Sequence, residues 1–289
     1  MNPVIGINMP DCISLDQMHE KLLVIKKNGF DGIEINLEIF PLIIEGEICR
    51  QWVDVFRKEL ERHQFFYTAH IGRGLDFRNT EDHDLHKQVL RSSLQICSEL
   101  NCSLLVLHYE KMSRNRKVEK QFFDAHREAA EFAAGLGITL GIENIEVENV
   151  EPVVEFVDKL DMENVKMVFD TGHTFLASSF FNFDFLEAVK LMLPYLGHVH
   201  LSDNTGRFEK LRITDRPVYD ALPMGWRREF GRGDIHLPPY FGKIPFDDIF
   251  RLLKNYRGKY ICEYTSDSFL PFNGKIQEKV RQKIIEMME

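Results

Sequence analysis

Imidazole and carboxylate side chains recur near the ends of short apolar segments in this 289-residue sequence. The six groups of this kind are His70 in FFYTAH, His108 in SLLVLH, Glu143 in TLGIE, Asp170 in KMVFD, His200 in HVH and Glu263 in YICE. His173 follows in the tetrapeptide DTGH, and Asp234 and His236 stand two residues apart in a later segment. Such a group inside a buried strand is costly, so its repeated appearance points to a function.

The chemistry of these nine side chains is that of a metal centre. The set contains five imidazoles, four carboxylates and no thiolate, which suits zinc, our preferred ion, or manganese better than magnesium or calcium. One tetrahedral ion needs four ligands, so nine ligands predict two or three ions with at least one shared carboxylate. Any single residue could instead cap a helix or satisfy a buried backbone group, but nine in register favour metal binding.

The segments that carry these residues alternate with amphipathic stretches such as Leu15 to Asn28 and Asp84 to Leu100, whose apolar residues have helical spacing. This alternation predicts one α/β domain over residues 1–289, a single eight-stranded parallel β/α (TIM) barrel. A doubly wound open sheet is the competing architecture, but the regular repeat favours closure. The expected strands are Val4 to Met9, Gly32 to Leu37, Phe65 to Ile71, Ser103 to Tyr109, Thr139 to Asn144, Val165 to Thr171, His198 to Asp203 and Tyr260 to Thr265.

The connection after the seventh expected strand is long. From Asn204 to about Ile244 it contains nine glycine and proline residues, which predicts an irregular loop with a functional role. In a β/α barrel the carboxyl ends of the strands converge on one mouth, where active sites are built. We therefore expect the nine candidate ligands to face one pocket beneath this loop.

Several segments resemble a known family: IEN at Glu143, DTGH from Asp170, HLSDN from His200, DIHLPP from Asp234 followed by GKIPF, and CEYT around Glu263. Through them the sequence resembles the xylose isomerase-like barrel superfamily and, within it, the branch that includes endonuclease IV. The resemblance implies three ions with a shared glutamate. Their ligands would be His70, His108 and Glu143; Glu143, Asp170, His200 and Glu263; and His173, Asp234 and His236.

The sequence departs from endonuclease IV where that enzyme contacts DNA. It reads GINMPDCISLDQ after the first strand in place of a histidine-containing, glycine-rich phosphate-binding segment. It reads IGRGLDF after the third strand, where endonuclease IV inserts side chains into the duplex, and IEVENV after the fifth. These departures disfavour duplex DNA as a partner and leave the metal ligands intact.

Three functions are compatible with this set of residues. The leading hypothesis is a multinuclear metal hydrolase of a phosphoester, in which Glu143 and Glu263 orient a hydroxide. The alternative is a sugar or sugar-phosphate isomerase or epimerase that uses one ion and the same two glutamates as an acid/base pair. The third is a metal-binding barrel without catalysis that serves as a partner-binding module.

Arginines near the expected mouth suggest an anionic or sugar-containing small substrate. Arg73 follows the third strand, and Arg207 and Arg232 belong to a locally basic part of the long loop. Arginine recognises phosphate and carboxylate groups through two parallel hydrogen bonds. The alternative interpretation is that these side chains make ion pairs on the surface of the loop.

The composition limits the remaining classes of function. The formal net charge of −9 argues against a broad basic surface for nucleic acid. Five cysteines without a CxxC pair disfavour a disulfide framework or a zinc finger. The sequence shows neither a secretion signal nor a stretch of about 18 uncharged apolar residues, the length that a bilayer span needs, so we expect a soluble, cytoplasmic protein.

Overall fold

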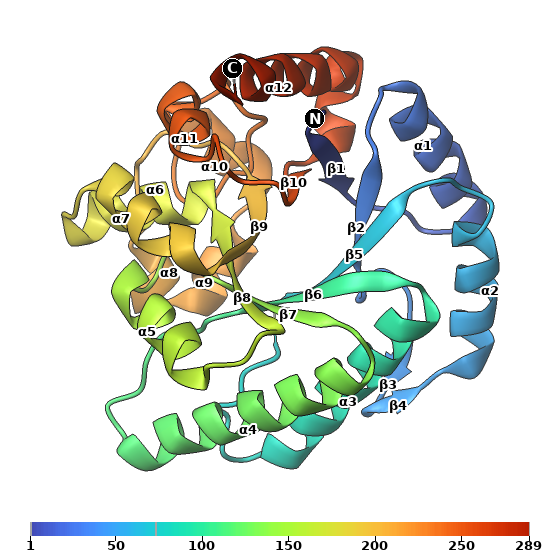
Figure 1. Ribbon diagram of the computed structural model, residues 1–289, viewed down its shortest axis with the longest axis vertical. Helices are drawn as coiled ribbons and strands as arrows, with labels where there is room; N and C mark the ends of the chain where they lie inside the picture. Colours follow the sequence, from blue (N-terminus) through green and yellow to red (C-terminus); the bar gives the residue numbers. More distant parts are fainter. Residues whose placement is uncertain (1, 73, 289) are drawn as a thin grey trace.

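Eight parallel strands form a closed barrel in the computed structural model, which describes residues 2–72 and 74–288 (Figure 1). The first strand, β1 (Val4–Asn8), pairs with both β2 (Gly32–Asn36) and β10 (Lys259–Cys262), so the sheet has no free edge. This closure confirms the predicted TIM barrel and excludes the open sheet. The other strands of the barrel are β5 (Phe66–Ile71), β6 (Cys102–His108), β7 (Thr139–Glu143), β8 (Val165–Asp170) and β9 (Leu196–Leu201).

Helices surround the barrel (Figure 1). Their buried apolar side chains belong to one core with those of the strands. In α1 (Leu15–Lys27), for example, Met18 and Leu22 are fully buried. A small two-stranded sheet of β3 (Ile43–Ile44) and β4 (Glu47–Ile48) is separate from the barrel. The other α-helices outside the long loop are α2 (Arg50–Leu60), α3 (His83–Glu99), α4 (Arg116–Gly135), α5 (Val150–Leu160), α6 (Thr171–Phe181), α7 (Phe185–Met192), α11 (Phe246–Leu252) and α12 (Asn273–Met288).

The expected strands all occur, and most of them end one to three residues before the apolar segments do. The long connection differs from the prediction, because it contains helical turns instead of being wholly irregular. Asp215 accepts a hydrogen bond from the backbone N–H of Val218, and Pro217 occupies the first turn, as is common where helices begin. The three short helices are α8 (Leu211–Thr214), α9 (Arg216–Ala221) and α10 (Met224–Phe230).

No helix in the described part of the chain is long and apolar enough to cross a membrane.

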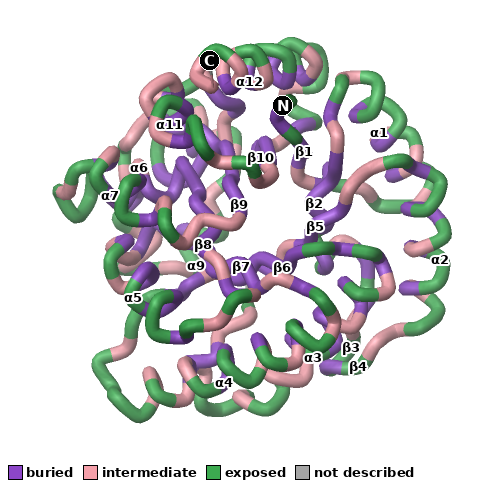
Figure 2. Tube along the Cα trace, in the orientation of Figure 1, coloured by how far each residue is buried: buried purple, intermediate pink, exposed green. Residues whose placement is uncertain are grey.

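The alternation of side chains along each strand separates the inside of the barrel from the layer beneath the helices. Leu105 and Leu107 of β6 belong to the large core shared with the helices, whereas Leu104 and Val106 form a separate cluster with Val168 of β8. Buried residues follow the strands around the barrel (Figure 2). A side chain two positions beyond an inward-facing one points the same way, so a residue at the carboxyl end of such a strand faces the mouth.

Asp203 fixes both ends of the long loop to the barrel. The backbone N–H groups of Asn204, Gly242 and Ile244 donate hydrogen bonds to its buried carboxylate over 2.8, 2.7 and 3.1 Å. Asp203 also forms a short antiparallel bridge with Leu237. The segment that carries Asp234 and His236 is therefore held close to the end of β9.

Replacing Asp203 by alanine should lower the free energy of unfolding by roughly 3 kcal/mol, because several hydrogen bonds to a charged group are lost together. The variant Asp203→Asn retains an acceptor oxygen and the side-chain volume, so its loss should be smaller. Urea denaturation of both variants measures the difference. If Asp203→Ala were as stable as the wild type, other contacts would hold the loop.

Candidate functional site

His70, His108 and Glu143 form the first group of predicted ligands at the mouth. They lie near the carboxyl ends of the neighbouring strands β5, β6 and β7, and His108 is directly opposite Glu143 in the strand register. The Nε2 atoms of His70 and His108 approach Oε2 of Glu143 to 3.1 and 3.2 Å. The strand order thus places these side chains close enough to bind a single ion.

A second group shares Glu143 and adds Asp170, His200 and Glu263. Asp170 ends β8 opposite His200 of β9, and Glu263 follows β10 directly. Nδ1 of His200 lies 3.2 Å from Oε1 of Glu143 and 3.0 Å from Oε2 of Glu263. One ligand atom from each of the four residues falls within 4.8 Å of the others. Glu143 contacts the first group through Oε2 and the second through Oε1, which is the geometry of a bridging carboxylate.

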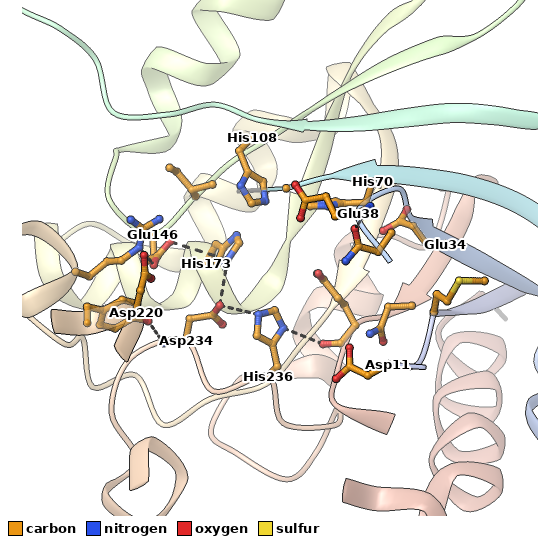
Figure 3. A pocket seen from close by; sticks show the side chains of 18 of the residues that line it. Asp11, Glu34, Glu38, His70, His108, Glu146, His173, Asp220, Asp234 and His236 are labelled. Atoms are coloured by element: carbon orange, nitrogen blue, oxygen red, sulfur yellow. Dashed lines mark hydrogen bonds and ion pairs between the residues drawn. The ribbon is translucent and has the colours of Figure 1, made fainter. Parts of the chain in front are cut away.

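The third group comes from α6 and the long loop. Nε2 of His173 and Nε2 of His236 lie 3.6 and 2.7 Å from Oδ2 of Asp234, which stands between the two rings (Figure 3). Their Nδ1 atoms face the backbone carbonyls of Asn144 and Glu263 at 3.0 and 3.3 Å, contacts that orient the rings. His236 has a φ of 41°, in the left-handed region that is uncommon for residues other than glycine. The loop therefore holds His236 in a strained conformation that directs its ring toward Asp234.

The charge of Glu143 is balanced by the imidazoles around it. Burial alone would raise its pKa, but His200 and His108 hold the pKa of Glu143 well below its usual value. Burial likewise opposes the charged form of His200 and His173, yet the neighbouring carboxylates raise the pKa of both imidazoles well above the usual value. An ion that binds here must displace protons from these rings.

Asp170 differs from the other carboxylates of the mouth. Burial raises its pKa to about 7; the charge of His173 opposes the shift, and the charges of Glu263 and Glu143 add to it. Its Oδ1 also accepts a hydrogen bond of 2.5 Å from the backbone N–H of His173 and so caps α6. Because a carboxylate binds a cation in its ionised form, ligation by Asp170 should strengthen as the pH rises through neutrality.

Buried polar atoms without a hydrogen bond test whether the mouth fits a metal. Among the described residues, Oδ1 of Asp234 and Oε2 of Glu263 have no hydrogen-bond partner. Oε2 of Glu263 lies 3.0 Å from Nδ1 of His200 without the direction that a hydrogen bond requires, and it belongs to the four-residue group whose ligand atoms are within 4.8 Å of one another. Buried polar atoms normally have partners, and convergent nitrogen and oxygen donors suit a divalent ion of the zinc or manganese type. The residues therefore fit a metal.

Glu34 of β2 is a residue of the site that the sequence analysis did not identify. It is 2% exposed, and its Oε1 lies 2.9 Å from Nε2 of His200. Its Oε2 is 3.0 Å from Nε2 of His198 and accepts a 3.0 Å hydrogen bond from Thr68. The contact orients the ring of His200 so that Nδ1 faces the ligand group. A charged residue inside the apolar segment GIEIN was the available signal.

A cavity of about 330 Å³ opens at this mouth. Arg212 and Arg216 of the long loop line it, although Nε of Arg212 is 2.6 Å from Glu146 and Arg216 is 3.7 Å from Glu110. The cavity is thus strongly polar, and its two arginines already face carboxylates. The predicted ligands in its wall are His70, His108, His173, Asp234, His236 and Glu263, most of which are labelled in Figure 3.

The structure does not bring Arg207 and Arg232, which were expected to bind substrate, to this cavity. Both are exposed, and neither belongs to the described residues that line the wall. Arg207 donates to the carbonyl of Phe230 over 3.2 Å, and Arg232 lies 3.4 Å from Glu209. The helical turns of the long loop direct these two side chains toward other parts of the loop. Arg73 lies outside the described residues.

The family model of the xylose isomerase-like TIM barrel matches residues 22–288. The chain belongs to this family. The match includes all nine candidate ligands and every barrel strand except β1. A comparison with curated proteins gave no match.

Several solved structures share the fold of this protein over nearly its whole length. A D-tagatose 3-epimerase-like protein has 20% identity and a TM-score of 0.74, with 100% of both chains covered. A xylose isomerase-like TIM barrel protein from Mycobacterium smegmatis, in complex with magnesium, has 16% identity and a TM-score of 0.73, with 100% of this chain and 98% of that chain covered. D-psicose 3-epimerase from Clostridium cellulolyticum H10, with D-tagatose, has 15% identity and a TM-score of 0.69, with 100% of both chains covered. At these identities the likeness establishes the common fold.

Removing the charge of Glu34 should weaken metal binding even though Glu34 is outside the three predicted ligand groups. Glu34→Gln should lower the affinity for zinc or manganese by about 10- to 100-fold, because His200 loses the carboxylate that orients it. Competition with a chelating dye measures the affinity. Thr68→Val, which removes only the hydroxyl contact to Glu34, is the matched control and should change the affinity little. An affinity for Glu34→Gln within twofold of the wild type would contradict this role.

Proposed function

We propose that this protein is a metal-dependent isomerase or epimerase of a sugar or sugar phosphate. The observation that carries the proposal is the convergence of Glu143 and Glu263 with Asp170 and His200 at the mouth. Isomerisation and epimerisation next to a carbonyl require a base that removes a proton from carbon and an acid that returns one. Two glutamates beside one ion meet that requirement without further residues.

The positions of the two glutamates suit proton transfer on a bound sugar. Glu143 ends β7 and Glu263 follows β10, with β8 and β9 between them in the barrel, so they lie in different parts of the mouth. Burial opposes ionisation of both, but His200 heads the groups that lower the pKa of each carboxyl below its usual value. Both are therefore ionised at neutral pH, and either can accept a proton from carbon.

The ion would supply a positive charge that polarises the substrate carbonyl and stabilises the negative charge that develops on its oxygen. Asp170 and His200 would hold it, together with the two glutamates. His200 is kept in place by Glu34, and Asp170 by the backbone N–H of His173. A divalent ion of the zinc or manganese class suits this mixture of nitrogen and oxygen donors.

The size and polarity of the cavity support a small sugar as the substrate. A volume of about 330 Å³ lies at the lower end of the range for small-molecule sites, roughly 300–1,000 Å³. Its wall also carries polar side chains from the first two strands and the loops after them, including Asn8, Asp11 and Asn36. The proteins of similar fold include a D-psicose 3-epimerase with D-tagatose, which makes ketohexoses the first substrates to test.

Proton exchange at carbon tests the proposal. The metal-loaded protein, incubated in heavy water with D-tagatose, D-fructose, D-psicose or their phosphates, should introduce deuterium at the carbon that is epimerised or isomerised. Glu143→Gln and Glu263→Gln should each reduce the rate by about 10²- to 10⁴-fold, because each loses a proton-transfer group. Proton and carbon NMR of the sugar measures both the exchange and the product.

Glu209→Gln is the matched control, since Glu209 is a buried glutamate of the long loop that does not line the cavity. Its rate should stay close to that of the wild type. If the metal-loaded wild type exchanged no proton in any of these sugars, the proposal would fail.

A second candidate, a phosphoester hydrolase, is favoured by the two further ligand groups. His70 and His108 share Glu143 with the four-residue set, and His173, Asp234 and His236 stand beside it. An epimerase with one ion leaves these groups without a metal to bind. Two or three ions at these positions would instead hold a hydroxide and a phosphate oxygen.

The variant His236→Asn separates the two candidates. A hydrolase that needs the third ion should lose activity on sugar phosphates and abasic DNA by at least about 10²-fold, because the charge that stabilises the phosphate is gone. An epimerase that uses only the four-residue set should keep its rate of proton exchange within about tenfold. Assays of both reactions, with the metal content of the wild type and the variant, decide between them.

We also propose that residues 1–289 act as one domain. The barrel closes between β1 and β10, so segments near the two ends of the chain lie in one sheet. This pairing, together with the family match over residues 22–288, supports a single unit with one mouth.

A further inference from the structure

Three ligand-type side chains also meet on the outside of the barrel, apart from the residues that line the cavity at the mouth. His19 lies in α1, Glu59 lies near the end of α2, and His63 lies just after that helix. The two helices stand next to each other around the barrel (Figure 1). None of the three side chains lines the cavity at the mouth, so they are independent of the proposed function.

The three ligand atoms form a compact triangle. Nδ1 of His19 lies 2.6 Å from Oε1 of Glu59 and 3.2 Å from Nε2 of His63. Nε2 of His63 is 3.2 Å from the same oxygen of Glu59. Two imidazoles from different segments thus direct one nitrogen each toward a single carboxylate oxygen.

We propose that His19, Glu59 and His63 bind a divalent ion of the zinc class that links α1 to α2. Two imidazoles and one carboxylate are a common ligand set for zinc. For metal–ligand bonds of about 2.0–2.1 Å in a tetrahedral site, neighbouring ligand atoms are roughly 3.3 Å apart. The nitrogen–nitrogen distance and one of the two nitrogen–oxygen distances match this spacing, and the other requires a movement of less than about 1 Å.

The surroundings hold the ligands in orientations that suit this role. Nη1 of Arg62 is 2.6 Å from Oε2 of Glu59 and leaves Oε1 directed toward the imidazoles. The side chain of His63 is only 3% exposed, and its ring stacks on Phe65 at a centroid distance of 6.2 Å. Contacts behind the ligand atoms of this kind are typical of metal sites.

The site is also accessible to an ion and to a fourth ligand. The side chain of His19 is 25% exposed, whereas those of Glu59 and His63 are nearly buried. A water molecule could complete a tetrahedral site on the side of His19.

The competing explanation is a hydrogen-bonded contact between the helices in which His19 and His63 both donate to Glu59. The two explanations differ in whether an ion is bound. Crystals of the full chain soaked in zinc should show an anomalous scattering peak at the zinc edge about 2 Å from Nδ1 of His19, Oε1 of Glu59 and Nε2 of His63. The wild-type protein in solution should retain one more zinc ion per chain than His19→Gln or Glu59→Gln.

His83→Gln is the matched control, because His83 is a partly exposed helical histidine outside every ligand group. This variant should retain as many zinc ions per chain as the wild type. Two variants are used so that one that fails to fold does not decide the result. A circular dichroism spectrum and a thermal unfolding transition like those of the wild type identify a folded variant. Absence of the peak at saturating zinc, or equal zinc content in the wild type, His19→Gln and Glu59→Gln, would overturn the proposal.

Discussion

The buried negative charge of Glu143 is the constraint on which the site depends. A carboxylate that is fully buried inside a barrel is costly unless positive charge compensates it. Three imidazoles, those of His70, His108 and His200, approach its two oxygens within 3.1–3.2 Å. The other carboxylates of the mouth then require further positive charge, which protonated rings or divalent ions supply. The mouth is therefore organised around the balance of these charges.

The closed barrel makes this arrangement possible because it brings strand ends from the whole chain to one place. His108 and Glu143 are opposite in register, as are Asp170 and His200, although the residues come from separate parts of the sequence. The long loop adds Asp234 and His236 to the same mouth, and Asp203 fixes that loop at both ends. A hydrolytic or an isomerising enzyme could use such a mouth, and the pair of glutamates together with the small polar cavity favours the isomerising one.

Much of the fold, and which candidate ligands lie together, could be predicted from the sequence. Strand positions follow from short apolar segments, and ligands such as His70 and Glu143 are recognisable because polar groups are rare at buried strand ends. Glu34 was not identified, because a single acidic residue within a strand does not disclose which partner it meets across the barrel. The side chains of Arg207 and Arg232 point toward other parts of the long loop and away from the cavity. Their directions depend on the short helices of that loop, whose arrangement is set by tertiary contacts. The meeting of His19 with Glu59 likewise depends on how two helices lie against each other.

Calorimetric titration of the protein with zinc at pH 7, in buffers of different ionisation enthalpy, tests the central claim most directly. The carboxylates raise the pKa of His200 and His173 well above its usual value, so these rings are protonated at pH 7. Each ring must lose a proton before its nitrogen can bind an ion. The account predicts the release of at least one proton per ion bound at the mouth and an affinity that rises with pH. A heat of binding that is independent of the buffer, with an affinity that does not change with pH, would contradict it.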